Sequence, residues 1–187
     1  MKDLNQLFQS FETGIRSAKS TKPREYLKSI GLDYNELRIG FNSGQFHHSA
    51  SEEEKSHYEE LGMLKKSTAA VRSENMIAYT VFGKKGIVFP LVNKAKDVVI
   101  YFVVRYELDT PVEEYLNTEG IYPHYPVTNT KRLFIAPTLM DAASILQSKA
   151  LDQREAVLAL HNGELLPQHT EAIESLTELE EIIIIKR

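Results

Sequence analysis

The chain has 187 residues, enough for one domain or two small lobes. Its 42% hydrophobic and 26% charged residues are an ordinary globular composition, which excludes a disordered or collagen-like chain. The formal net charge of −4 provides no overall positive field, so any binding to nucleic acid needs a local basic patch. With no cysteine, the chain excludes a disulfide scaffold, a thiol nucleophile and a cysteine zinc finger.

Neither a signal peptide nor a membrane span is predicted. Residues 1–6 lack the apolar core of a signal peptide. The longest apolar runs, such as 98–104, fall far short of the ~20 residues that a spanning helix needs. We therefore expect a cytoplasmic protein without a membrane partner.

Three segments in the first third of the chain have helical patterns. One has apolar residues at three- and four-residue spacing, one starts near a proline and stops at a glycine, and one starts at a serine followed by glutamates. These helices are expected at 4–15, 23–31 and 51–62. Residues 38–46, which contain Gly40 and Gly44, are expected to form an interrupted strand.

The middle of the chain has β character. Residues 86–92 and 98–104 are rich in β-branched and aromatic residues and are almost entirely apolar. Such runs predict strands that are buried on both faces or lie centrally in a sheet. Residues 109–130, which contain several prolines, are expected to form an extended connector.

The last part alternates between strand and helix patterns. The expected strands are 132–136, 156–160 and 182–185, and the expected helices are 139–146 and 167–176. This order implies right-handed crossovers and a parallel three-stranded sheet. Four consecutive isoleucines at 182–185 fit a strand that is buried on both faces.

No catalytic residue or metal ligand is predicted. The six histidines lack metal-binding spacing, and the adjacent His47 and His48 would point to opposite faces of a strand. We interpret them as polar surface and turn residues. Neither a nucleophile elbow nor a phosphate-binding loop is present in the sequence.

Basic residues gather in the β-rich middle. They are Lys84, Lys85, Lys94, Lys96 and Arg105. If the predicted hairpin brings them together, they form a local phosphate-binding face on an acidic protein. Scattered solubilising charge explains the pattern equally well, so the sequence leaves both interpretations open.

Several segments, in order, resemble the catalytic core of bacterial DnaG-type DNA primases, especially the primase-like proteins of Bacteroidetes mobile elements. Residues 24–32 are similar to the YL-x-x-RGL helix of that family, and residues 39–48 to its IGYNSGQFHH stretch. Residues 86–91, 102–105 and 115–117 are similar to RIMFPI, FGGR and KYLN. The resemblance covers residues 23–187.

The resemblance implies an α+β fold. An N-terminal helix and linker (1–22) would precede a mixed α/β primase-type lobe (23–130), and a small parallel three-stranded Toprim-like unit (131–187) would follow. Enzymes of the family hold Mg²⁺ through a glutamate after the first Toprim strand and a DxD pair after the third, and the metal ions steer phosphoryl transfer.

The chain departs from the family at these positions. Pro137 occupies the place of the metal-binding glutamate, and Lys186 and Arg187 follow the third strand where the DxD pair would begin. Glu114 replaces the lysine of KYLN, Arg105 alone remains of the GGR trio, and the cysteine-rich zinc domain is missing. Asp141, on the next helix, is a poor substitute for the missing acids. No cofactor is therefore expected to bind, although the family uses Mg²⁺.

These departures predict a primase-like, nucleic-acid-associated protein that is inactive on its own. Its partners would be single-stranded DNA or a replication or mobilisation protein. The predicted nucleic-acid-binding residues are Lys84, Lys85, Lys94, Arg105 and Asn117. Two alternatives remain: a fragment of a longer active primase, and an interaction module that forms a homodimer through the apolar strand 182–185.

Overall fold

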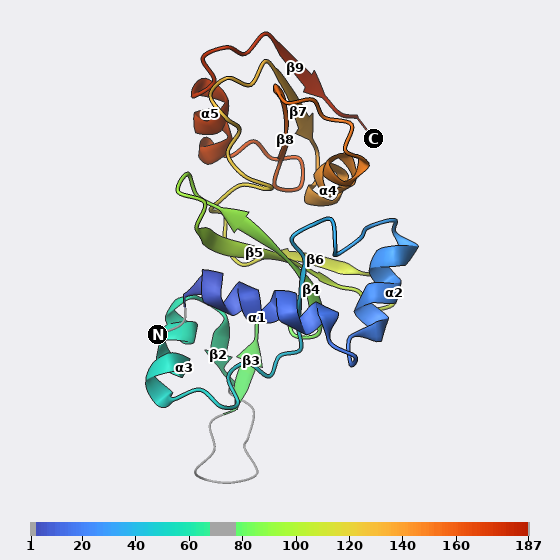
Figure 1. Cartoon of the computed structure of the whole chain (residues 1–187). Helices are drawn as coiled ribbons and strands as arrows, with labels where there is room; N and C mark the ends of the chain where they lie inside the picture. The colour runs from blue at the N-terminus through green and yellow to red at the C-terminus, as the bar shows by residue number, and fades with distance from the viewer. Residues whose placement is uncertain (1–2, 68–77, 187) are drawn as a thin grey trace.

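The computed structural model describes residues 3–67 and 78–186, in which helices alternate with short strands (Figure 1). The helices are α1 (Leu4–Arg16), α2 (Thr21–Ser29), α3 (Glu52–Glu60), α4 (Leu139–Ser148) and α5 (Pro167–Glu174). The strands are β1 (Gly40–Asn42), β2 (Leu64–Lys66), β3 (Tyr79–Val81), β4 (Gly86–Val92), β5 (Val98–Arg105), β6 (Val112–Tyr115), β7 (Arg132–Ala136), β8 (Glu155–Ala159) and β9 (Glu181–Ile184). Within the described ranges, no helix has the length and apolar character needed to cross a membrane.

The first predicted helix is confirmed as α1. The Asp3 side chain caps it by accepting a hydrogen bond from the Gln6 backbone N–H at 2.8 Å. Its apolar stripe, which includes Phe8 and Phe11, is buried. The helix lies very close to β1, because a Cβ at Gly40 would come within 2.6 Å of the Phe11 Cβ. Glycine at this position is therefore a packing requirement.

The next two helices are also present, with one shifted start. α2 begins at Thr21 rather than at Pro23, which lies inside the first turn. Proline is tolerated there because the first-turn N–H groups have no partner within the helix. α3 begins as predicted, with a capping box in which Ser51 Oγ accepts from the Glu54 N–H and Glu54 Oε2 accepts from the Ser51 N–H.

A four-stranded antiparallel sheet forms the centre of the N-terminal part, in the order β1-β4-β5-β6. The two apolar runs of the sequence are its central strands and pair with Ile87 opposite Val104. One face, which includes Tyr101 and Val103, packs against α1 and its surroundings. The other face, which includes Phe102, packs towards the C-terminal part. Burial on both faces was the predicted state of these strands, and it is confirmed.

Three short strands differ from the sequence prediction. β6 lies inside the expected connector 109–130 and pairs along β5, with Tyr115 opposite Phe102. It is an edge strand with Glu113 and Glu114 at its centre, so it lacks the apolar signal of a buried strand. β1 covers only part of the predicted strand 38–46, and β2 pairs with β3 in a separate hairpin.

The C-terminal part is the predicted parallel unit. Its three strands are ordered β8-β7-β9, and β7 pairs in parallel with both neighbours. α4 and α5 connect successive strands, and Figure 1 shows this unit on the side of the antiparallel sheet that is opposite α1. The strand–helix–strand–helix–strand pattern therefore predicted both the elements and their parallel arrangement.

The segment before β7 joins the two sheets through its backbone. Ile121 and Val92 exchange two N–H···O bonds of 3.0 Å, and the Ala159 N–H donates to the Tyr122 carbonyl at 3.0 Å. One buried core also runs from the antiparallel sheet to Leu139 on α4. The two parts are thus held together by both hydrogen bonds and apolar packing.

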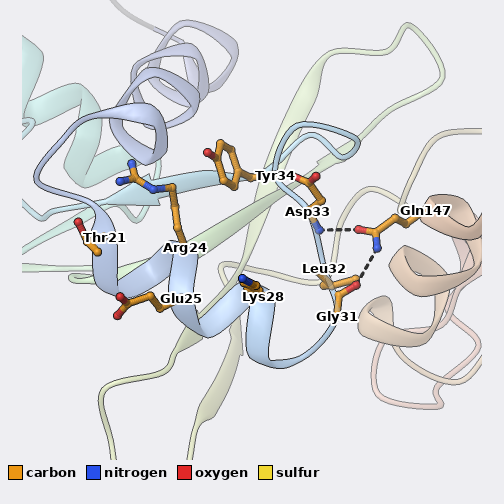
Figure 2. A pocket seen from close by; sticks show the side chains of 9 residues that line it. All are labelled: Thr21, Arg24, Glu25, Lys28, Gly31, Leu32, Asp33, Tyr34 and Gln147. Atoms are coloured by element: carbon orange, nitrogen blue, oxygen red, sulfur yellow. Dashed lines mark hydrogen bonds between the residues drawn. The ribbon is translucent and has the colours of Figure 1, made fainter.

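Gln147 makes a second connection between the parts, from the end of α4 to the loop after α2 (Figure 2). Its Nε2 donates to the Gly31 carbonyl at 2.7 Å, and its Oε1 accepts from the Asp33 N–H at 2.5 Å. The side chain closes one side of a cavity of about 510 Å³ beside α2. Arg24, which also lines this cavity, donates to the carbonyls of Ile15 and Ser17.

Candidate nucleic-acid interface

The structure divides the predicted basic residues between two ends of the β4–β5 hairpin. Lys84 and Lys85 lie in the turn before β4, and Arg105 ends β5 beside them, since Ile87 pairs with Val104. Lys94 lies in the turn at the opposite end. A seven-residue strand separates the two ends by roughly 20 Å at ~3.3 Å per residue.

Three of these cations already pair with carboxylates of the chain. Arg105 Nη2 lies 2.5 Å from Glu114 Oε1, Lys85 Nζ lies 3.5 Å from Glu107 Oε2, and Lys94 Nζ lies 2.6 Å from Glu171 Oε1. The hydrogen bond to Glu171 raises the pKa of Lys94. These pairs partly cancel the positive potential that a phosphate would meet.

Asn117 does not join either cluster through its side chain. It follows β6, and its Oδ1 accepts a hydrogen bond from the Glu119 N–H at 2.7 Å. This is a local turn contact of the kind that asparagine makes with backbone two residues ahead. The five predicted binding residues therefore do not form one continuous face.

Lys84 has different surroundings from the other basic residues. It lines a cavity of about 480 Å³ whose other walls are Gly44, His47, His48, Lys55, Ala78, Tyr79 and Val81. Within residues 3–67 and 78–186, no carboxylate lies in ion-pair contact with Lys84. Lys55 contributes a second ammonium and is paired with Glu52 at 2.6 Å. We call this group, His47, His48, Lys55, Tyr79 and Lys84, the Lys84 cavity.

Asn42 positions two turns beside this cavity. Its side chain is buried, donates to the Phe82 carbonyl at 2.9 Å and accepts from the Gly44 N–H at 2.8 Å. Gly44 has a φ of +82°, and a Cβ there would lie 2.6 Å from the Lys84 Cγ. The aliphatic part of Lys84 thus lies directly over the glycine, and the same lysine lines the cavity.

His47 supplies an uncharged polar ring. Burial, followed by the nearby cations and His48, lowers its pKa below the ordinary value. Its ring lies 4.6 Å from His48 and 5.8 Å from Tyr79, both edge-on. Its Nδ1 is buried and has no hydrogen-bond partner in the part of the chain that the structure describes. Ammonium groups beside aromatic rings are the combination that contacts phosphates and bases of a single strand.

Four residues of the cavity were not predicted from the sequence: His47, His48, Lys55 and Tyr79. The two histidines lie in a turn, as one interpretation of them expected, and not on a strand. Their only signal in the sequence is the resemblance of the stretch 39–48 to the primase family. Lys55 and Tyr79 are distant in sequence and carry no motif of their own.

The C-terminal ends of β7 and β8 hold a different set of side chains. Pro137 follows β7, and the Thr138 hydroxyl caps α4 while it donates to Asp141 Oδ2 at 2.6 Å. The His161 ring stacks on Tyr115 at 4.4 Å and meets His169 edge-on at 5.1 Å. Among residues 3–67 and 78–186, no three His, Asp or Glu side chains converge as metal ligands. These residues do not fit a carboxylate-held Mg²⁺ pair.

Comparisons with known proteins give matches only at the level of structure. No protein-family model matches the sequence, and no curated protein matches it. A DnaG primase catalytic domain solved with single-stranded DNA superposes with a TM-score of 0.73 at 15% identity, over 95% of this chain and 57% of that one. A DNA primase domain from Pseudomonas aeruginosa gives 0.75 at 13% identity, over 97% and 60%.

The chain has the fold of the DnaG primase catalytic core. The E. coli primase catalytic core agrees, with a TM-score of 0.72 at 15% identity over 97% of this chain and 60% of that one. The chain therefore spans less than two thirds of the primase structures that it matches. The predicted resemblance is confirmed at the level of the fold, and the lobe boundaries and the binding residues remain predictions.

Proposed function

We propose that the chain is a primase-like protein that binds single-stranded nucleic acid through the Lys84 cavity and does not itself join nucleotides. The observation that carries this proposal is the ammonium of Lys84, which has no acidic partner among residues 3–67 and 78–186, beside imidazole and phenol rings in one cavity. The other cations at this end of the hairpin, Lys85 and Arg105, support it as a weaker rim because each has an acidic partner.

The solved primase structures support nucleic acid as the ligand class. One is described as a DnaG catalytic domain bound to single-stranded DNA. Another is the RNA polymerase domain of Mycobacterium tuberculosis DnaG in complex with double-stranded DNA. A single strand fits the Lys84 cavity better than a duplex, because unstacked bases can lie against its histidine and tyrosine rings.

The proposed lack of nucleotidyl transfer rests on the side chains of the parallel unit that could bind a metal ion. A Toprim-type site needs carboxylates after β7, where this chain has Pro137 and an Asp141 already bonded to Thr138. On β6, the edge strand of the antiparallel sheet, Glu114 forms an ion pair with Arg105. Arg105 is therefore not free to contact a phosphate. We infer that binding of a strand is the retained activity.

The second proposal from the sequence, that the chain is part of a longer active primase, is favoured by its partial span of the neighbours. Reading the coding sequence beyond Arg187 for an in-frame DGD-type stretch tests it. Pro137 would still leave such an enzyme without one of the family's metal-binding carboxylates.

A pair of matched variants tests the binding proposal. Lys84→Ala and Lys94→Ala remove the same charge, but only Lys84 lines the cavity, whereas Lys94 is held by Glu171 at the other end of the hairpin. Fluorescence anisotropy of a labelled single-stranded oligonucleotide at low salt measures the affinity. We expect Lys84→Ala to weaken binding severalfold and Lys94→Ala to leave it unchanged.

Two results would count against the proposal. One is a parent protein that leaves the oligonucleotide free at every concentration. The other is an equal loss of affinity in both variants, which would indicate a general charge effect. Primer synthesis by the parent chain with Mg²⁺ and nucleotides would contradict the proposed lack of catalysis while leaving the binding site intact.

A further inference from the structure

The cavity beside α2 takes no part in the proposed function (Figure 2). Its volume of about 510 Å³ is in the usual range of small-molecule sites, and it lies where the two parts of the chain meet, as such sites often do. One face of α2 forms much of its wall, because the residues there are three or four positions apart. They are Thr21, Arg24, Glu25 and Lys28. The loop 31–34 and Gln147 of α4 complete the wall.

Two side chains hold this wall in place. Arg24 Nη1 donates to the carbonyls of Ile15 at 3.0 Å and of Ser17 at 2.6 Å, which ties α2 to the end of α1. Gln147 holds the loop after α2 from the other side through its two hydrogen bonds. A wall that is already ordered loses little conformational freedom when a ligand binds, so its contacts with the ligand contribute more fully to affinity.

Three other polar side chains of the wall have hydrogen-bonding capacity that the chain does not use. Among residues 3–67 and 78–186, neither Lys28 nor Glu25 has an ion-pair partner. Asp33 Oδ1 accepts from the Asn35 backbone N–H at 2.8 Å and from its side-chain amide at 2.9 Å. Its second oxygen, Oδ2, has no partner within the same ranges. The wall therefore offers a ligand one ammonium as a donor and two carboxylates as acceptors.

The remaining surface of the cavity is aromatic and aliphatic. Leu32 and the half-buried ring of Tyr34 line it, and Arg24 and Lys28 add the methylene groups of their side chains. Figure 2 shows Tyr34 and Asp33 along the loop and Lys28 along α2. Flat aromatic ligands such as nucleobases pack against tyrosine rings without regard to their sequence of ring atoms, because every base has a π-face.

The charges of the wall limit how much negative charge a ligand can carry. Two basic side chains, Arg24 and Lys28, are balanced by two acidic ones, Glu25 and Asp33. A single phosphate can bind the Lys28 ammonium, whereas the further phosphates of a triphosphate would meet the carboxylates. The carboxylates suit hydroxyl donors instead, as in nucleotide sites where an acidic side chain binds the ribose.

We propose that this cavity binds a ribonucleoside monophosphate. The base packs against Tyr34, and the phosphate binds Lys28. The ribose hydroxyls donate to Glu25 and Asp33. Each chemical part of the ligand thus has a matching group in the wall. The proposal does not rest on strand binding by the Lys84 cavity, because the two cavities share no lining residue.

Isothermal titration calorimetry of the full chain with adenosine monophosphate (AMP) tests the site. Adenosine lacks the phosphate, ribose phosphate lacks the base, and deoxyadenosine monophosphate lacks one hydroxyl. We expect each of these three compounds to bind severalfold more weakly than AMP. A chain that does not bind AMP at millimolar concentration would overturn the proposal. Equal affinities for AMP and its deoxy form would overturn the role of the carboxylates.

Matched variants locate the bound nucleotide. We expect Lys28→Ala to lower the affinity for AMP to that for adenosine, and to leave the affinity for adenosine unchanged. Glu25→Gln should reduce the preference for AMP over its deoxy form, because an amide is a weaker acceptor than a carboxylate. Lys65→Ala removes the same charge from an exposed position on β2 and should bind AMP like the parent.

Two results with these variants would contradict the assignment. An equal loss of AMP affinity in Lys28→Ala and Lys65→Ala would indicate a general charge effect. A loss in Lys84→Ala, with Lys28→Ala like the parent, would place the nucleotide in the Lys84 cavity. Binding of single-stranded DNA by Lys28→Ala keeps the two proposals apart, since it should match the parent whether or not AMP binds beside α2.

Discussion

Arg105 and Glu114 show how single residues set the electrostatic character of the basic end of the hairpin. The two lie on neighbouring strands, and their side chains meet at 2.5 Å. The resembling family has a lysine at the position of Glu114, so the sequence indicated the charge reversal. The pairing itself needed the register of β5 with β6, which the sequence did not predict.

The buried ring of His169 links the stability of the protein to pH. It is fully buried at the start of α5, where its Nδ1 accepts from the Leu166 N–H at 2.9 Å. Burial, and next the neighbouring His161, lower the pKa of His169 to about 4. The pKa of His161 is also lowered by burial. Both rings are therefore neutral in the folded protein near pH 7.

We predict that the protein loses stability as the pH falls from about 6.5 to 4. Between these pH values His169 binds a proton in the unfolded chain but not in the folded chain. The free energy of unfolding is therefore highest above this pH range and falls as the pH is lowered through it. The lowered pKa of His169 corresponds to a loss on the order of 3 kcal/mol in the free energy of unfolding. Urea unfolding at several pH values measures it.

His169→Gln separates titration from packing. Glutamine at this third helix position can accept the same Leu166 N–H, as in a capping box, but it does not titrate. The variant should lose less stability than the parent on acidification, whereas His124→Gln, at an exposed position, should match the parent. An equal acid loss in parent and His169→Gln would refute the assignment.

At the scale of elements, the strength of the sequence signal decided what could be predicted. Long apolar runs gave β4 and β5, because burial on both faces leaves a continuous apolar stretch. Alternating strand and helix patterns gave the parallel unit, but the expectation that 182–185 is buried on both faces was wrong, since Ile182 and Ile184 of β9 are exposed. The short β2 and β6 contain mostly polar residues and are defined by their pairing partners. Their formation depends on tertiary contacts that no local pattern records.

A Gln147 variant tests how much the contact between α4 and the loop after α2 contributes to stability. Its side chain makes two hydrogen bonds from α4 to the loop after α2 (Figure 2). Gln147→Ala removes both, and we expect a loss of roughly 1–3 kcal/mol in the free energy of unfolding. Gln153→Ala, at an exposed position, is the control. Equal urea midpoints for the two variants would show that the connection adds nothing.

At the scale of the whole molecule, the site could be predicted only in part. The sequence indicated Lys84 as a basic residue of interest but placed it with Lys94, which the fold carries to the opposite end of the hairpin. The cavity walls come from three distant segments of the chain, near residues 44–48, 55 and 79–84. Their convergence follows from the β1–β4 pairing and from Asn42.

The net charge of −4 gives this arrangement a further consequence. A protein without a global positive field binds a polyanion only through its local cations, so few counterions are released. We expect a shallow dependence of affinity on salt, with each phosphate contact on a single strand adding about 0.7 to the slope of log K against log salt.

The most direct test is therefore a salt titration of single-stranded DNA binding for the parent, Lys84→Ala and Lys94→Ala. Loss of the Lys84 contact should reduce the slope by about 0.7, and Lys94→Ala should keep the slope of the parent. A slope that is unchanged in Lys84→Ala, or reduced only in Lys94→Ala, would contradict the assignment of the Lys84 cavity as the site where this primase-type fold holds a nucleic-acid strand.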